Sequence, residues 1–171
     1  VLPAMCPNVG CGIGTANWLD WTGTISIIPL KIDLFCGDSK PLSDCYESIK
    51  RYVDYVERIS NNHLTTWGRG DWVPVKSKSN KELTSSVYFY VDTKILAAAA
   101  KLFGQQADYE YYNALSEEIK QAVNDKLLNR ETGLYAEGSH TELSFPLLWK
   151  IVPAALIRRG ALNLAPQVSG S

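Results

Sequence analysis

Apolar residues recur at intervals of three and four along much of this chain, the spacing that puts them on one face of a helix. A clear example runs from residue 43 to residue 59. Its apolar stripe consists of Tyr46, Ile49, Tyr52, Val53, Val56 and Ile59. Ser43 is the expected N-cap, because it lies just after Pro41 and its hydroxyl can accept from an unpaired backbone N–H. The segment is predicted to be an amphipathic helix with one buried face.

Three other segments are apolar on nearly every side, which is typical of helices buried in a core. Each is followed by an amphipathic segment, so the pattern alternates between an inner and an outer helix. The pairs are 24–35 with 43–59, 84–103 with 108–128, and 141–152 with 153–164. In the second inner helix, Thr84, Ser85 or Ser86 can act as the N-cap, and Gly104 suits the position after the C-cap. The chain is therefore predicted to fold into three helical hairpins.

Successive inner and outer helices predict an all-α fold of antiparallel hairpins, either a solenoid or a closed (α/α) toroid. A ring of six hairpins needs roughly 200 residues before any functional loop, at about 12 residues per helix and about 5 per connection. With its long loops, this chain of 171 residues has room for only about half of such an (α/α)6 toroid. The predicted divisions are a glycine- and tryptophan-rich entry segment at 1–23, the partial toroid at 24–164 with a loop at 60–84, and a flexible tail at 165–171. Residues 72–75 and 133–135 are at most short extended pieces.

The charges are balanced, with 17 Lys and Arg against 18 Asp and Glu and a formal net charge of −1. No basic excess exists to neutralise phosphates, so neither a nucleic acid nor an anionic membrane surface is an expected partner. No apolar run reaches the roughly 20 residues of a membrane-spanning helix. No cofactor is expected. The chain begins without Met and without a signal-peptide pattern, and both ends would suit a piece of a longer protein.

The four cysteines, Cys6, Cys11, Cys36 and Cys45, do not match the C-x-x-C spacing of zinc or redox sites. Free thiols and a disulfide both remain open at this point. A metal site is not expected, because each loop offers at most one histidine.

Unusual residues lie in the loops that precede the three inner helices. They are Trp18 and Asp20 in the first loop, Asp71 and Trp72 in the second, and His140 and Glu142 in the third. All three loops are expected at the same end of the inner helices. Carboxylates that accept from hydroxyls, beside indole faces that stack on C–H surfaces, are typical of a sugar-binding cleft. The alternative is that the tryptophans pack in the core and the carboxylates cap helix N-termini.

Several short motifs occur in a characteristic order. They include Asn17-Trp18-Leu19-Asp20, Cys36-Gly37-Asp38, Gly70-Asp71-Trp72 and His140-Thr141-Glu142-Leu143. In this order and spacing, residues 8–160 resemble the catalytic domain of bacterial α-L-rhamnosidases, glycoside hydrolase family 78. The resemblance implies a six-hairpin toroid that releases terminal L-rhamnose with inversion, using an acid and a base on opposite sides of the sugar.

The resemblance also implies which residues contact the sugar. In the family, the acid precedes and the base follows the matched portion, so no catalytic acid or base is expected within this chain. Trp18, Asp20, Asp71 and Trp72 match positions that contact rhamnose. The third loop departs from the family pattern, because His140 stands where Gln is usual; the contacts of His140 and Glu142 are therefore inferred from the position of their loop.

The chain is thus predicted to be an internal slice of a rhamnosidase-like glycosidase that binds a rhamnose-containing carbohydrate but is inactive alone. Half a ring would leave apolar helix faces open at its edges and so predicts self-association. A non-catalytic helical module that binds a glycan or peptide, and a toroid hydrolase for another sugar, are the alternatives. The linkage, the aglycone and the compartment (bacterial cytoplasm, periplasm or outside the cell) stay open.

Overall fold

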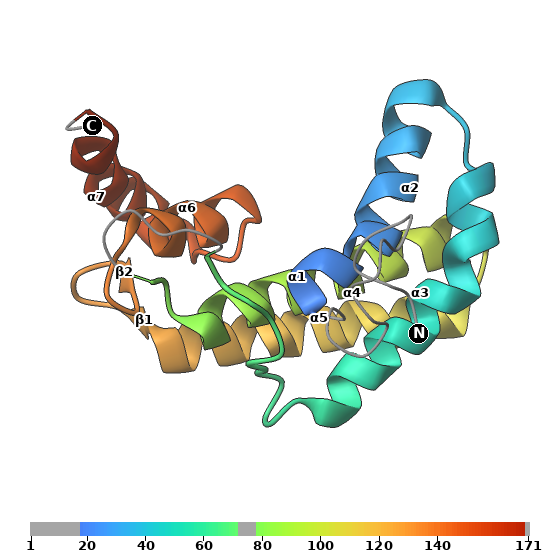
Figure 1. The fold of residues 1–171 in the computed structure, drawn as a ribbon, viewed down its shortest axis with the longest axis horizontal. Coiled ribbons are helices and arrows are strands. Elements are labelled where there is room, and N and C mark those ends of the chain that lie inside the picture. The colour runs from blue at the N-terminus through green and yellow to red at the C-terminus, as the bar shows by residue number, and fades with distance from the viewer. Residues whose placement is uncertain (1–17, 72–77, 170–171) are drawn as a thin grey trace, which may run out of the picture.

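The computed structural model describes residues 18–71 and 78–169, which are mostly helical (Figure 1). In chain order the elements are α1 (Leu19–Thr22), α2 (Thr24–Cys36), α3 (Lys40–Ile59), α4 (Lys81–Leu102), α5 (Gln106–Leu127), β1 (Leu128–Asn129), β2 (Leu134–Tyr135), α6 (His140–Leu148), a 3-10 turn (Ala154–Leu156) and α7 (Ile157–Ser169). The long helices form the three predicted pairs, α2 with α3, α4 with α5, and α6 with α7. The expectation of an all-α fold of inner and outer hairpins is therefore confirmed.

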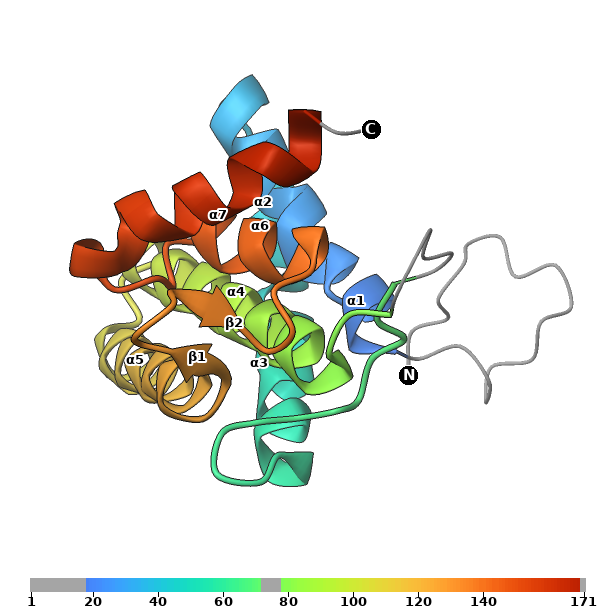
Figure 2. The same cartoon turned by 90° about the vertical axis from the view of Figure 1, so that its left-hand side faces the viewer.

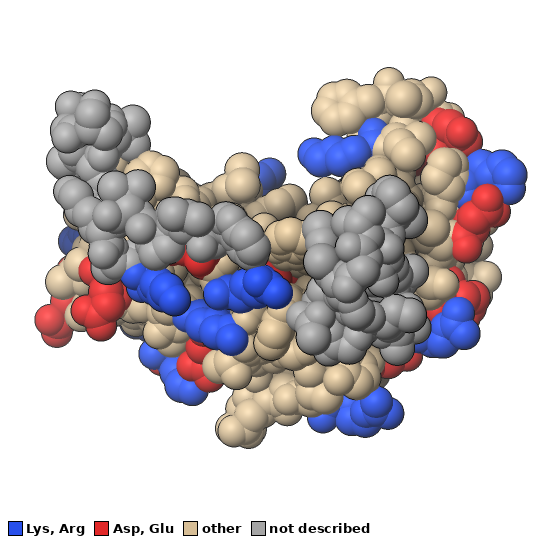
Figure 3. Space-filling view, viewed as in Figure 1, with Lys and Arg blue, Asp and Glu red and all other residues tan. Residues whose placement is uncertain are grey.

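Helix α4 is the centre of this arrangement. It contacts α1, α2, α3, α5 and α6. In Figure 1, α4 and α5 run side by side between the α2–α3 pair at one end and the α6–α7 pair at the other. Figure 3 shows that the surface is hollowed between these two end pairs. The α4–α5 hairpin thus connects the two end hairpins, α2–α3 and α6–α7, and forms the floor of the hollow between them.

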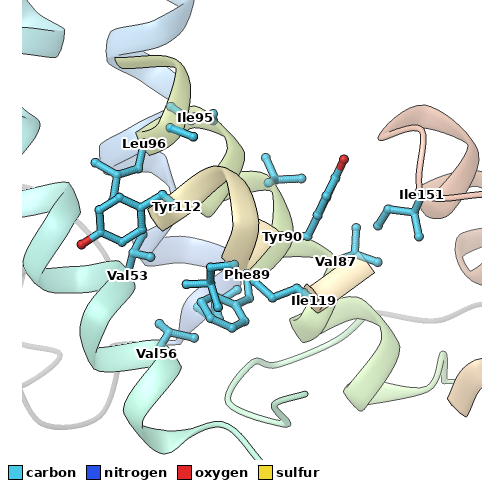
Figure 4. Close-up of a cluster of buried hydrophobic side chains, with 14 of the residues drawn as sticks. Val53, Val56, Val87, Phe89, Tyr90, Ile95, Leu96, Tyr112, Ile119 and Ile151 are labelled. Carbon is cyan, nitrogen blue, oxygen red and sulfur yellow. The ribbon is translucent and has the colours of Figure 1, made fainter. Parts of the chain in front are cut away.

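The continuous apolar pattern of α4 explains its central position, because a helix that is apolar on all sides is stable only when neighbours cover it. Figure 4 shows its side chains meeting those of α3 and α5 in one cluster. The labelled residues are Val87, Phe89, Tyr90, Ile95 and Leu96 of α4, Val53 and Val56 of α3, Tyr112 and Ile119 of α5, and Ile151. Truncation of a buried aromatic such as Phe89, which is 1% exposed, is expected to cost about 3–5 kcal/mol.

Helix α3 begins earlier than the sequence pattern predicts. It starts at Lys40, with Ser39 in the N-cap position, so the prediction that Ser43 caps the helix is wrong. Pro41 lies in the first turn, where its missing N–H would have no intrahelical partner in any case. Ser43 is an exposed residue inside the helix.

Helix α4 also begins ahead of its predicted start. The side chain of Asn80 accepts from the backbone N–H of Leu83 at 3.0 Å and caps the helix, in place of Thr84, Ser85 or Ser86. Those three residues are buried inside the first turns instead. The other end is as predicted: Gly104 has φ 70°, and the N–H of Gln105 donates to the carbonyl of Ala100 at 2.8 Å.

The third hairpin is shorter on its inner side than expected. Helix α6 ends at Leu148 rather than at residue 152, because the chain leaves the helical conformation and Lys150 has φ 57°. Within the predicted extended piece 133–135, Leu134 and Tyr135 form β2, which pairs with β1 through Leu128–Tyr135 and Asn129–Leu134, while Gly133 lies in the turn with φ 75°. Helix α7 continues to Ser169, so the segment from residue 165 that we expected to be a flexible tail is largely helical.

Helix α2 is the predicted first inner helix, but it buries few of its apolar side chains completely. Only Ser26 and Pro29 are buried, whereas Phe35 is 81%, Leu34 63% and Ile28 54% exposed. Helices α1, α3 and α4 contact α2 but leave these three side chains uncovered. An edge of the hairpin row therefore carries open apolar surface.

Cys36 and Cys45 are free thiols. Cys6, Cys11, Trp72 and the extended piece predicted at 72–75 lie outside the described residues, as does most of the entry segment 1–23. Over the described ranges, no helix has the length and apolar character needed to cross a membrane.

Candidate functional site

The loops ahead of α2, α4 and α6 meet, as the sequence pattern predicts. Asp20 in the first loop accepts from the backbone N–H of Arg69 in the second at 2.8 Å. Asp71 in the second loop accepts from the hydroxyl of Thr141, at the start of α6, at 3.1 Å. Figure 2 shows α1 beside the chain that leads from α3 into α4. Three segments distant in sequence thus form one surface.

The first loop is fixed by its backbone. The N–H of Leu19 donates to the carbonyl of Trp67 at 3.1 Å, and the buried Leu19 side chain anchors the short helix α1 in the core. The Trp67 indole packs edge-on against Tyr55, with ring centres 5.3 Å apart. Trp67 therefore has the packing role that was the alternative for each tryptophan.

Four buried polar atoms lack a hydrogen-bond partner among the residues that the structure describes. They are Nε1 of Trp18, Oδ1 of Asp20, Oγ1 of Thr22 and Oγ of Ser85. Three belong to the first loop, and Ser85 lies directly below the second, because a Cβ on Gly68 would be 2.4 Å from its Oγ. An unsatisfied buried polar group costs about 1–3 kcal/mol, so this cluster of donors and acceptors is suited to a ligand that supplies hydroxyl groups.

Two cations flank the ring of Trp18. The guanidinium carbon of Arg69 lies 5.7 Å and the ammonium nitrogen of Lys81 lies 5.2 Å from the ring centre. Cation–π contacts of this kind hold an indole in place. Trp18 is therefore held in a fixed position with its indole N–H buried, and part of its ring surface is covered by these two cations.

Asp71 is the most strongly bound carboxylate of the second loop. Its Oδ2 accepts from the backbone N–H and the hydroxyl of Ser79 at 2.9 and 2.5 Å, and its Oδ1 accepts from Thr141. Although burial alone would raise the pKa of Asp71, these hydrogen bonds from Ser79 and Thr141 lower it below its usual value. Asp71 is therefore ionised at neutral pH and keeps lone pairs for a further donor.

Glu142 holds the third loop against the second. It is 1% exposed, and its two carboxylate oxygens accept from the backbone N–H groups of Asn80 at 2.6 Å and of Ser139 at 2.8 Å. The Ser139 hydroxyl in turn accepts from the backbone N–H of Glu142. These two reciprocal hydrogen bonds between Ser139 and Glu142 form a capping box at the start of α6. The His140 side chain lies exposed beside it. The structure thus brings Trp18, Asp20, Asp71 and Glu142 to one end of the inner helices.

Sequence reasoning missed the residues that connect the loops or lie directly beneath them: Arg69, Ser79, Lys81, Ser85 and Thr141. A partial signal was present, because Ser79 and Thr141 are hydroxyl residues close to predicted carboxylates or helix starts. No side-chain group in the described ranges could hold a metal ion. A separate hollow of about 370 Å³ lies on the outer side at α5, lined by Glu117, Lys120, Gln121, Asn124, Arg130 and Pro153, and none of the loop residues borders it.

The hairpin scaffold that carries these three loops occurs in known proteins. A family model described as the bacterial alpha-L-rhamnosidase 6 hairpin glycosidase domain matches residues 1–170. The chain belongs to this family. The resemblance inferred from the sequence motifs is thereby confirmed, and the match includes all six predicted site residues.

Individual relatives agree with this membership. The α-L-rhamnosidase of Streptomyces avermitilis is 26% identical over 162 residues, which are 94% of this chain and 15% of that protein. The solved α-L-rhamnosidase of Dictyoglumus thermophilum superimposes with a TM-score of 0.80 and 29% identity, over 88% of this chain and 18% of that chain.

The structure of the Streptomyces avermitilis α-L-rhamnosidase complexed with L-rhamnose has a TM-score of 0.77 at 24% identity, over 83% of this chain and 14% of that chain; this likeness supports the fold. The chain therefore spans less than a fifth of the length of these rhamnosidases. Its three described hairpins correspond to half of a six-hairpin domain.

Proposed function

We propose that this chain forms a sugar-contacting part of an α-L-rhamnosidase that releases terminal L-rhamnose with inversion, and that it binds the sugar without supplying the acid or the base. The observation that carries the proposal is that the three loops meet, and that four buried polar atoms in or below the first two loops have no hydrogen-bond partner among the described residues. A ring of hydroxyl groups complements such a set, because each hydroxyl both donates and accepts.

Each residue has a role that follows from its contacts. Asp20 offers its free Oδ1 as an acceptor, and Trp18 offers its indole N–H as a donor. Asp71, ionised and partly exposed, accepts from a second hydroxyl. Trp72 is assigned to ring stacking by the family resemblance, and the exposed His140 lies where it can contact a bound sugar from the third loop.

The described carboxylates of the site are poorly suited to acid catalysis. A general acid must be protonated near the working pH, whereas the pKa of Asp71 is lowered. Glu142 has both oxygens bound by backbone N–H groups and positions the loops instead. The chain is therefore proposed to supply contacts and scaffold, while an acid and a base from other segments carry out the inversion.

Calorimetry tests the binding part of the proposal. We expect L-rhamnose to bind the chain more tightly than D-glucose, and Asp20→Asn and Asp71→Asn to weaken binding at least tenfold. Asp44→Asn, on the exposed face of α3, is the matched control and should bind normally. Equal binding of unrelated glycans would favour the non-catalytic module. Hydrolysis of an aryl rhamnoside by the chain alone, abolished in Asp71→Ala, would contradict the assignment of the acid and base to other segments.

A further inference from the structure

The carboxyl group of Asp92 lies where α1, α2, α3 and α4 converge, and the proposed site does not use it. The side chain projects from the middle of α4 and is 1% exposed. Its Oδ1 is hydrogen-bonded to the hydroxyl of Ser26 on α2, and its Oδ2 accepts from the hydroxyl of Tyr52 on α3 at 3.0 Å. Asp92 therefore connects three helices through two hydroxyl groups.

The turn between α1 and α2 lies directly on this carboxyl group. A Cβ on Gly23 would be 2.8 Å from Oδ2 of Asp92, closer than a carbon and an oxygen can approach. Only a glycine therefore allows the turn to pack so closely. Since Asp20 lies three residues earlier, the position of the first site loop depends on this contact.

The hydroxyl groups around Asp92 can satisfy a protonated carboxyl without a counter-ion. The hydroxyl of Ser26 lies within hydrogen-bonding distance of Asp92 and also 2.8 Å from the carbonyl of Gly23, but it has a single hydrogen to donate. If Asp92 is protonated, it donates to Ser26, Ser26 donates to Gly23, and Tyr52 donates to Oδ2. Every hydroxyl hydrogen then has an acceptor. The Gly23 carbonyl also accepts from the backbone N–H groups of Ser26 and Ile27, and the Tyr52 hydroxyl also lies 3.3 Å from the carbonyl of Leu19.

An ionised carboxylate at this position would receive two hydrogen bonds from the described side chains, and no cation from the described part of the chain pairs with it. Asp92 takes part in no ion pair within the described ranges. The titratable groups that face it or share its partners are Tyr52 of α3, Tyr88 of α4 and Asp20 of α1, and α2 contributes the neutral Ser26. Burial raises the pKa of Asp92 to about 7, against the opposing effect of the hydrogen bonds from Ser26 and Tyr52.

We propose that Asp92 is protonated in the folded protein and is a positioning residue, whose O–H group holds Ser26 and thereby fixes the Gly23 turn and the Asp20 loop. The protonation is inferred from the burial of the carboxyl group, its two neutral hydroxyl partners and the lack of an ion pair among the described residues, and it does not depend on the proposed function. Its effect on sugar binding rests on that function. Ionisation at alkaline pH loosens the turn, because the carboxylate can no longer donate to Ser26.

The sign of the pH effect on stability follows from the proton balance. Between the unfolded pKa of about 3.9 and the raised folded value, the folded state holds a proton that the unfolded state has lost. The free energy of unfolding therefore decreases as the pH rises through this window. Asp92→Asn should remove the effect, because its amide can donate to Ser26 and accept from Tyr52 at every pH.

Thermal unfolding of the wild-type chain, Asp92→Asn and Asp92→Leu between pH 5 and pH 8 tests the proposal. The Tm of the wild type is expected to fall by about 4 °C or more relative to Asp92→Asn over this range. Asp92→Leu should be destabilised at every pH, since it leaves Ser26 and Tyr52 without their partner. Asp44→Asn, on the exposed face of α3, should follow the wild type.

Equal destabilisation of Asp92→Asn and Asp92→Leu, or identical pH profiles of wild type and Asp92→Asn, would overturn the proposal. If neither variant folds, infrared spectroscopy of the wild-type chain tests the protonation of Asp92 directly. A band of a buried protonated carboxyl at pH 6 that disappears at high pH supports it, and the lack of that band contradicts it. Calorimetry of Asp92→Asn with L-rhamnose separates the two proposals. If the variant is as stable as predicted but does not bind rhamnose, the protonation of Asp92 is supported and only the proposed sugar-binding function is contradicted.

Discussion

Asp71 accepts a hydrogen bond from the hydroxyl of Thr141 at 3.1 Å, although the two residues are 70 positions apart in the sequence. Asp71 belongs to the loop before α4, and Thr141 belongs to the first turn of α6. Together with the Ser79 contacts, this bond holds two of the three site loops in a single arrangement. The site is therefore expected to respond as a unit when either residue is changed.

Asp71→Asn is expected to lower stability by about 1 kcal/mol at pH 7, because the amide cannot accept from Ser79 and Thr141 as the carboxylate does. The folded pKa of Asp71 is lowered, so its contribution is present above the unfolded pKa of about 3.9 and is lost as the pH falls through the folded value. Urea unfolding of the wild type and Asp71→Asn at pH 7 and at pH 2.5 measures the free energy of unfolding at both values. The difference between wild type and variant should shrink in acid, and a constant difference would show that the charge is not involved.

Gly68→Ala is expected to destabilise the second loop, because its Cβ would lie 2.4 Å from Oγ of Ser85. The pair Gly68→Ala and Ser85→Ala gives a double-mutant cycle. Ser85→Ala alone should be nearly neutral, since its buried Oγ has no partner among the described residues, and the double variant should recover part of the loss. Strict additivity of the two changes in Tm would rule out the close contact.

Ser139→Ala is expected to cost about 1 kcal/mol, because it removes the side-chain half of the capping box at the start of α6. Ser43→Ala is the informative comparison. The sequence pattern makes Ser43 the cap of α3, whereas the structure places it exposed inside that helix, where alanine should be neutral or slightly stabilising. Thermal unfolding of both variants tests whether Ser43 caps α3 or lies inside it. A larger loss of Tm for Ser43→Ala than for Ser139→Ala would contradict the structure.

The hairpin pattern was predictable because the stripes of α3 and α5 and the apolar run of α4 are properties of the sequence itself. Helix starts were less predictable. Several serines and threonines near the start of α4 could each cap it, and the packing of the helix decides that they are buried and that Asn80 caps. The contact of Asp20 with Arg69 depends on the approach of loops 49 positions apart, which no local pattern encodes.

The exposed apolar edge of α2 predicts self-association of the isolated chain. Phe35, Leu34 and Ile28 are each more than half exposed, and covering them would remove apolar surface from water. Phe35→Asp should shift the chain toward the monomer in sedimentation velocity experiments. Ala114→Asp, on the exposed face of α5, controls for the added charge. A wild-type chain that stays monomeric at high concentration would contradict this prediction.

The central claim is that the three-loop surface binds L-rhamnose through the buried polar atoms of the first loop. The most direct measurement is a titration followed by the indole N–H resonances in a ¹H–¹⁵N spectrum, with the Trp18 signal assigned from Trp18→Phe. L-rhamnose is expected to move the Trp18 resonance in a saturable manner, D-glucose to move it far less, and Asp20→Asn to weaken the response. A Trp18 resonance that does not move at high L-rhamnose concentration would contradict the central claim.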